Sequence, residues 1–599
     1  MVTLKQLRDL KRSEFEDAAD GWGDTSNRAS SARDRVDNEM LLKIRKTQKG
    51  EAADTAAAAL KQLSSNYQYI HAECGLIRTA LNGLASELGS PQRKLKDALA
   101  DAENLKFTVN DDGSVHYETK VPLAPDAGSA RAGSDNAPRL LKPTDANQAK
   151  AEGIADAIAD ALDEANRIDA SYARTLGRLG TNSDLKVTEA MWADAGRDLK
   201  AVRKTAGDFL PEGDIPNGKS PAENKAWWEN LPKEDQDQYA AMYPASVGAL
   251  DGIPSSVRDD ANRVVLAETH GKTEQQLNQW KQKEPTKYGQ YYDPYTGRPL
   301  KNAMVETEAW KAWNEEERRL KGSLKGMDAI NARFNQTGKN ELPEAYLLNF
   351  DTKGNGHAVV ANGNPDTASD TAVFVPGTDS KLEGAKDQIT RMTRLWQEAE
   401  GMPGGGDVST VTWIGYDAPQ GVIPEAMSKS FAHEGAPRLN QFLDGVQTAQ
   451  GGPDASHTTV IGHSYGSTVV GDASIKGDLA ADDIVVAGSP GMLVGHARDL
   501  DVGAEHTWSE AASTIKDGVP AGGKVAMLGG SGVYTTEEWH GVPSEITVTM
   551  DVVPSDRGFG ANIMQTDSND HGGYWDTESV SLKNQAAVVT ENYDKVERG

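Results

Sequence analysis

The chain has 599 residues, of which 37% are hydrophobic and 26% are charged, and its formal net charge is −27. This length exceeds what one hydrophobic core usually serves, so we expect several domains. The negative charge argues against binding to nucleic acid, because contact with a phosphate backbone needs clustered Lys and Arg. The single cysteine, Cys74, excludes an intramolecular disulfide.

The N-terminal 23 residues alternate apolar and charged side chains. They lack the apolar stretch of about 7–15 residues that a secretory signal peptide carries. No uninterrupted apolar run in the sequence approaches the roughly 20 residues of a membrane-spanning helix. We therefore expect a cytoplasmic protein without a membrane span. Export by a signal-peptide-independent, type VII-like route is also compatible with this sequence.

The front half of the chain favours helices. Apolar residues recur at helical intervals over 4–46 and 52–88, which predicts a helical hairpin within 1–105 that turns at "TQKG" (47–50). After it we predict three further segments: a β-hairpin and flexible linker (106–142), a second helical segment and linker (143–220), and a helical segment that leads into the last domain (221–340). The last segment opens with Ser220, Pro221 and Glu223, a capping box.

Residues 341–599 follow a different pattern, in which short apolar runs alternate with helical ones. Near-continuous apolar runs of this kind predict a mostly parallel sheet that helices cover on both faces. The first two runs, joined by "DTKGNG", predict an antiparallel hairpin at the start of the sheet. The predicted strands are "AYLLNF", "HAVVAN", "TAVFVPG", "VSTVTWIG", "HTTVIG" and "DDIVVAG". The fold class is therefore α/β, with an all-helical region in front.

Ser464 lies in "GHSYG", between a predicted strand and a predicted helix. The pattern G-x-S-x-G at such a turn is typical of the nucleophile elbow of α/β hydrolases, in which glycines allow the strand and helix to approach closely. The pentapeptide alone also occurs by chance in chains of this length, so a plain structural turn is the alternative. Its position within an α/β series favours a nucleophile.

Two backbone amides would complete an oxyanion hole beside Ser464. One comes from the residue after the nucleophile and the other from a loop after an earlier strand. Tyr465 follows the serine, and "VPGTDSK" ends a strand at Pro376-Gly377 before a helix predicted to begin near Asp379. We therefore predict that Tyr465 and Thr378 supply these amides. A strand-to-helix turn without this role is the alternative.

In this fold the catalytic acid and histidine follow the serine in that order. Among the four histidines after the elbow, His571 lies in a polar loop behind a short strand predicted at 561–566, and it is our candidate base. Two candidates for the acid remain open on the residues alone. Asp551 follows the better strand, whereas Asp517 follows a weaker one but leaves more chain before the last strand.

Long motifs of this chain resemble an actinobacterial α/β-hydrolase family of largely undefined function. They are the "WWENLPKEDQDQYAAMYPASVGALDGIPSSVRDDANRVVL" segment, "VVANGNPDTASDTAVFVPGT", "TVTWIGYDAPQG", "TVIGHSYGSTVVG" and "VVAGSPGM". The resemblance implies a serine-hydrolase fold with its nucleophile at Ser464 and its base at His571. It also favours Asp517 over Asp551, because "HTW" (506–508) and "WHG" (539–541) bracket it, although Gly518 stands where the family has Pro.

The resemblance implies a serine hydrolase with a Ser464, His571 and Asp517 triad. Our default expectation for the substrate is a small ester, less readily an amide. We expect no cofactor and no metal, since the loop at 567–578 only partly fits a calcium-binding pattern. The N-terminal helices, which resemble WXG-type hairpins at "DGWG" (20–23), are candidates for binding a protein partner or for self-association. The alternative is a non-catalytic interaction or type VII secretion-associated protein built on a hydrolase fold.

Overall fold

The computed structural model describes residues 1–118, 146–180, 185–539 and 542–599. The linker predicted within 106–142 lies mostly outside these residues. Contacts group the chain into two compact units, of which the first comprises Met1–Arg28, Glu73–Ser183 and Asp198–Glu212, and the second Ala29–Ala72, Asp184–Arg197 and Gly213–Gly599. These units do not coincide with the segments drawn from the sequence, because helices α4 (Glu51–Glu87) and α7 (Glu189–Ala206) contribute residues to both.

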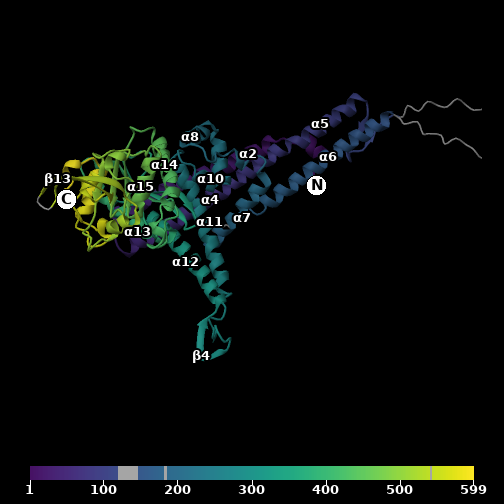
Figure 1. Ribbon diagram of the computed structural model, residues 1–599. Helices are drawn as coiled ribbons and strands as arrows, with labels where there is room; N and C mark the ends of the chain where they lie inside the picture. The colour runs from purple at the N-terminus through teal and green to yellow at the C-terminus, as the bar shows by residue number, and fades with distance from the viewer. Residues whose placement is uncertain (119–145, 181–184, 540–541) are drawn as a thin grey trace, which may run out of the picture. The chain divides into compact units, whose positions relative to one another are not determined.

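The first unit is helical, as its periodicity predicts. Helices α5 (Gly89–Asn104) and α6 (Ala146–Leu176) lie side by side (Figure 1). Strands β1 (Thr108–Val109) and β2 (Val115–His116) form the predicted antiparallel hairpin around the Asp-Asp-Gly turn. A short α1 (Leu4–Arg8) precedes these elements, and its apolar residues Leu4 and Leu7 are buried.

The segment "DGWG" does not break a helix. Residues 20–23 lie inside α2 (Ser13–Arg35), and the chain turns instead at 48–50, between α3 (Leu42–Thr47) and α4. Gly23 serves close packing, because a Cβ there would lie 2.8 Å from Arg78 Nε. The expected turn at "TQKG" is confirmed, whereas the WXG-type resemblance at "DGWG" is not accompanied by a turn.

Helices of the second unit lead from the capping box toward the sheet. Ser220 Oγ accepts a hydrogen bond from Glu223 N, and the Glu223 carboxylate accepts one from Ser220 N, so the predicted capping box is present. The helices that follow are α8 (Pro221–Asn230), α9 (Lys233–Met242), α10 (Pro244–Gly248), α11 (Ser255–Lys281) and α12 (Glu308–Phe334).

One hairpin of the second unit was not predicted from the sequence. Strands β3 (Tyr288–Tyr292) and β4 (Pro299–Glu306) pair antiparallel at the end of the adjacent helices α11 and α12 (Figure 1). The signal was present, because "YGQYY" and "KNAMVE" are strand-like runs on either side of the turn "DPYTG". It was overlooked because the helical periodicity of the residues on both sides led us to predict helix throughout this segment.

The predicted strands of the back half form one eight-stranded sheet in the order β14-β11-β10-β9-β7-β8-β6-β5. β5 and β6 form the predicted antiparallel hairpin, β6 also pairs antiparallel with β8, and the remaining neighbours are parallel. The strands are β5 (Ala345–Asp351), β6 (His357–Asn362), β7 (Asp370–Val375), β8 (Val408–Ile414), β9 (His457–His463), β10 (Asp483–Ala487), β11 (Thr507–Glu510) and β14 (Asn562–Ile563).

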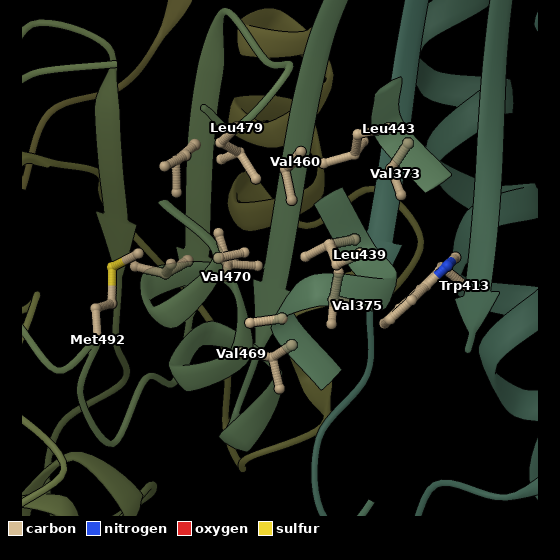
Figure 2. Close-up of a cluster of buried hydrophobic side chains, with 14 of the residues drawn as sticks. Val373, Val375, Trp413, Leu439, Leu443, Val460, Val469, Val470, Leu479 and Met492 are labelled. Carbon is tan, nitrogen blue, oxygen red and sulfur yellow. The ribbon is translucent and has the colours of Figure 1, made fainter. Parts of the chain in front are cut away.

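Helices cover this sheet on both faces, because successive side chains of a strand point to opposite sides. On β7, Val373 and Val375 belong to the core cluster that contains residues of α14 (Ser430–Gln450) and α15 (Tyr465–Lys476), part of which Figure 2 shows. Phe374 belongs instead to the cluster formed with α13 (Ala385–Glu400) and α17 (Val580–Val589). The predicted α/β class, with helices in front, is confirmed.

The strand that precedes Asp551 lies outside the main sheet. β13 (Val542–Val552) pairs antiparallel with β12 (Gly530–Trp539) to form a separate two-stranded sheet. The short helix α16 (Val519–Ala526) lies between β11 and this pair in the sequence. Asp517 therefore lies in the loop that follows β11 of the main sheet, whereas Asp551 lies in the separate two-stranded sheet.

A buried carboxylate ties together the amino ends of the central strands. Asp483 Oδ1 accepts hydrogen bonds from Trp508 Nε1 at 2.7 Å and from His506 Nδ1 at 3.1 Å. Asp483 Oδ2 accepts one from Tyr593 OH at 2.6 Å and lies 3.0 Å from His457 Nε2. These contacts connect β9, β10 and β11 to the C-terminal segment of the chain.

The ion pair of His457 and Asp483 predicts a pH dependence of stability. Burial alone would lower the pKa of His457, but Asp483, Asp482 and Glu591 raise it above 6.5. Burial alone would raise the pKa of Asp483, but its hydrogen bonds lower it below 3.8. The pair therefore stabilises the fold most between about pH 4 and 6.5, and this contribution is lost as the pH rises through the pKa of folded His457.

His457→Gln tests this dependence. Urea unfolding followed by tryptophan fluorescence should give a larger loss of stability for the variant at pH 5.5 than at pH 9. A loss of equal size at both values would contradict the assignment.

Candidate active site

Ser464 occupies the turn between β9 and α15 in a strained backbone conformation. Its φ is 54° and its ψ is −131°, a region that costs a residue with a side chain about 1–3 kcal/mol. Ser464 N donates to Ala487 O at 3.0 Å, which ties the turn to the end of β10. The Ser464 side chain makes no capping hydrogen bond to α15. The hydroxyl of Ser464 therefore does not cap the N-terminus of α15.

Glycines make this turn sterically feasible. A Cβ on Gly462 would lie 2.6 Å from Ser467 Cα, and a Cβ on Gly466 would overlap Val375 O. Both glycines of "GHSYG" therefore stand where another chain segment leaves no room for a side chain. This is the close approach that the sequence pattern predicts.

The strain at Ser464 predicts a gain in stability when it is relieved. Ser464→Gly removes the Cβ that makes a positive φ costly, whereas Ser464→Ala retains it. We expect the glycine variant to be more stable than the alanine variant by about 1 kcal/mol, after the larger backbone entropy of glycine is subtracted. Urea-unfolding midpoints of the two variants measure the difference. Equal midpoints would mean that the turn holds no strain.

Asp517 and His571 are brought together by loops that follow β11 and β14. Asp517 Oδ2 accepts a hydrogen bond from His571 Nδ1 at 2.9 Å and one from Tyr574 OH at 2.7 Å, while Asp517 Oδ1 accepts one from Val519 N at 3.0 Å. Gly488, at the end of β10, leaves space for the pair, since a Cβ there would lie 2.7 Å from Asp517 Oδ2 and 2.9 Å from the His571 ring.

These hydrogen bonds keep Asp517 ionised. Burial alone would raise the pKa of its carboxyl group, but the bonds from His571, Tyr574 and Val519 outweigh burial and lower the pKa below its usual value. Tyr574, which is fully buried, has its own pKa raised by burial and by the neighbouring carboxylate. A protonated tyrosine and an ionised aspartate thus form a fixed donor–acceptor pair at neutral pH.

His463, beside the serine, supports the loop that carries His571. His463 Nε2 donates to His571 O at 2.8 Å, and Arg391 NH1 donates to His463 Nδ1 at 3.3 Å. Burial, reinforced by Arg391 and by His571, lowers the pKa of His463 well below its ordinary value. A neutral imidazole with one donating and one accepting nitrogen fits both contacts. This contact was not predicted from the sequence.

The other candidate acid lies elsewhere. Asp551 sits beside Gly529 at the end of β13, and burial raises the pKa of its carboxyl group. Within the described residues, Asp517 is the carboxylate that bonds to His571. Of the two acids that the residues alone left open, the structure therefore brings only Asp517 to the histidine.

The loop after β7 packs directly against the serine turn. A Cβ on Gly377 would lie 2.7 Å from Ser464 Cβ and 2.8 Å from Tyr465 N. The amides of Thr378 and Tyr465 make no hydrogen bond with the described part of the chain. The helix predicted near Asp379 begins later, at Ala385, because Asp379 adopts a positive φ of 65° and its amide donates to Pro419 O.

Ser464, His571 and Asp517 line one cavity of about 650 Å³, together with Thr378 and Tyr465. It is larger than the polar cavities of about 310 Å³ near His270 and about 210 Å³ near His357. Its size lies within the range of small-molecule sites. The described residues contain no cluster of three or more His, Cys, Asp or Glu suited to hold a metal ion. None of the described helices is both long and apolar enough to span a membrane.

Comparison with known proteins agrees with this architecture. Residues 351–522 match a family model described as "Alpha/beta hydrolase". Together with the eight-stranded sheet, the match defines the C-terminal part of the chain as an α/β-hydrolase domain behind a helical N-terminal region. Arg391 and Tyr574, which the sequence analysis did not select, belong to this domain. The signal for Tyr574 was its position in the sequence, three residues after the candidate base His571.

Two mycobacterial relatives extend the comparison. The chain is 28% identical over 532 residues to "Uncharacterized protein Rv2079" of Mycobacterium tuberculosis, a match that covers 86% of this chain and 75% of the relative. It is 30% identical over 176 residues to "Uncharacterized protein Mb0988c" of Mycobacterium bovis, which covers 28% of this chain and 65% of that protein. Their names assign no activity. No solved structure matches the chain significantly.

Proposed function

We propose that this protein is a serine hydrolase that cleaves an ester through an acyl-enzyme on Ser464. The hydrogen bond of 2.9 Å between His571 Nδ1 and Asp517 Oδ2, in the cavity that Ser464 also lines, carries this proposal. A histidine held by an ionised carboxylate beside a serine is the arrangement that activates a hydroxyl nucleophile. If the strained turn at Ser464 had only a structural role, the hydrogen-bonded pair of His571 and Asp517 in the same cavity would have no explanation.

The hydrogen bonds of His571 fix its role in the proposal. Its Nδ1–H is used toward Asp517, so the free lone pair lies on Nε2. His571 Nε2 is buried and has no hydrogen-bond partner among the described residues. It is therefore available to accept the proton of Ser464 when an ester binds, since such contacts often tighten only in the substrate complex.

The reaction then follows in two halves. Ser464 Oγ attacks the ester carbonyl carbon while its proton moves to His571 Nε2, and the amides of Thr378 and Tyr465 would hold the resulting oxyanion. Return of the proton to the alcohol oxygen releases the alcohol and leaves an acyl group on Ser464. Water, deprotonated by His571, then hydrolyses this acyl-enzyme and regenerates the serine.

A fluorophosphonate probe tests the proposal, because it labels only serines that are activated in this way. The full-length protein should be labelled, and Ser464→Ala should not. Heat-denatured protein is the matched control and should remain unlabelled. Labelling that persists in Ser464→Ala, or its absence from the native protein, would reject the serine-hydrolase function in favour of a non-catalytic role.

A further inference from the structure

The cavity around Ser464 has one apolar wall that the proposed reaction does not use. Helix α16 contributes Val519, Gly522, Gly523 and Ala526 to the lining. These positions are spaced by three and four residues, so they share one face of the helix. That face carries no polar side chain. Gly523 packs against the backbone of Pro490, whereas Gly522 borders open space, because a Cβ added there would meet no atom within 4 Å.

A second apolar part of the lining comes from another segment of the chain. Val422, Ile423, Ala426 and Met427 line the cavity from the segment between β8 and α14. Tyr465, next to the nucleophile, holds the end of this segment, because its hydroxyl donates to Ser428 O and accepts from Ala432 N. The apolar segment is thus anchored to the residue that follows the catalytic serine of the proposed mechanism.

Apolar side chains continue from these walls onto the surface. The exposed fraction is 69% for Val422, 78% for Ile423 and 77% for Val525. Ile515 and Met527, from the segment of α16, are also exposed. In the described part of the chain, large exposed apolar residues gather at this mouth and at the β3–β4 hairpin. Exposed apolar side chains that gather beside a cavity typically mark a binding site.

We propose, building on the serine-hydrolase function, that the substrate is an ester with a long aliphatic chain that lies between α16 and the 422–427 segment. The polar side chains of the lining, which include Gln388, Arg391 and Lys516, come from outside α16 and the 422–427 segment. These two apolar parts of the lining can therefore contact the aliphatic chain of the substrate. The net charge of −27 disfavours a polyanionic substrate. A chain longer than the cavity would continue over the exposed apolar rim.

Chain-length series of esters test the inference. If the chain is buried, kcat/KM should rise by about fourfold for each added methylene until the cavity is filled. One series varies the acyl group as p-nitrophenyl acetate, butyrate and octanoate, and the other varies the alcohol as methyl, butyl and octyl acetate. A rise in the first series assigns the chain to the acyl side, and a rise in the second assigns it to the alcohol side. A flat or falling profile in both overturns the inference.

Gly522→Leu and Ala521→Leu separate the cavity from the rest of α16. Leucine at 522 occupies the space that the chain would fill. In the series that shows the rise, the ratio of kcat/KM for the longest ester to kcat/KM for the shortest should therefore fall at least about tenfold. Ala521 is exposed on the same helix and does not line the cavity, so its variant should keep the wild-type ratio. Leucine is a better helix former than glycine, which favours folding of the first variant. An unchanged ratio in Gly522→Leu would contradict the inference.

The labelling experiment distinguishes the two levels of failure. Fluorophosphonate labelling at Ser464 with no dependence on chain length would leave the hydrolase function standing and reject the aliphatic substrate. Absence of both labelling and ester hydrolysis would reject the hydrolase function itself.

Discussion

His571→Ala is expected to lower kcat for ester hydrolysis by about 10⁶-fold. Removing the histidine of a serine triad costs about as much as removing the whole triad, because no other group then accepts the serine proton. The loss should appear in kcat rather than in KM, since the imidazole acts on the reacting atoms. Steady-state kinetics with p-nitrophenyl butyrate measure both constants. A loss smaller than about 100-fold would exclude His571 as the base.

His506→Ala is the matched control. His506 also follows the serine in the sequence, but it contacts Asp483 at the amino ends of the strands and does not line the cavity. Its replacement should leave kcat within about twofold, although it should reduce stability slightly because a hydrogen bond to a buried carboxylate is lost. A comparable fall of kcat in both variants would point to unfolding rather than to loss of the base.

Asp517→Asn should lower kcat by about 10⁴-fold while the fold remains intact. An asparagine that presents its NH₂ group to His571 Nδ1 makes that nitrogen an acceptor and favours the tautomer in which the proton sits on Nε2, which cannot accept the serine proton. The same substitution removes the negative charge that stabilises the imidazolium formed during the reaction. Steady-state kinetics at a pH well above 7 should retain the deficit.

Asp551→Asn provides the comparison that separates the two candidate acids. Its carboxyl group lies at the end of β13 and its side chain does not bond to His571. We expect kcat to remain within about threefold of wild type. If Asp551→Asn were the more damaging variant, Asp517 would have to be a structural residue and the acid would come from the β12–β13 pair.

The turn at Ser464 and the strands beside it could be predicted from the sequence, because each depends on local patterns. Glycines at 462 and 466 and β-branched residues on β9 are visible along the chain. The acid could not be settled from the residues alone, because its identity depends on which loop reaches His571 across the sheet. Strand quality favoured Asp551, yet β13 is a better strand for a reason unrelated to the main sheet: it pairs with β12.

Tyr574 and His463 illustrate a second limit. Their contacts with Asp517 and with His571 O join residues that are 57 and 108 positions apart in the sequence. Sequence periodicity and motif spacing predict contacts between residues close together in the chain, and they give no information on contacts across such long separations. The β3–β4 hairpin was missed for the opposite reason, since strongly helical neighbours on both sides masked a local strand signal.

Residues far upstream of the sheet are built into the same compact unit. Tyr69 packs edge-on against Trp192 with ring centroids 5.3 Å apart, and both belong to a buried cluster with Val264 of α11. Asp260, also on α11, pairs with the buried Arg33. A gene fragment that begins at residue 213 would therefore encode the whole sheet and the cavity but leave Val264 bare and Asp260 without its cation. We therefore expect a fragment cut at that boundary to be less stable than the same residues in the full chain, because it exposes apolar surface and an unpaired carboxylate.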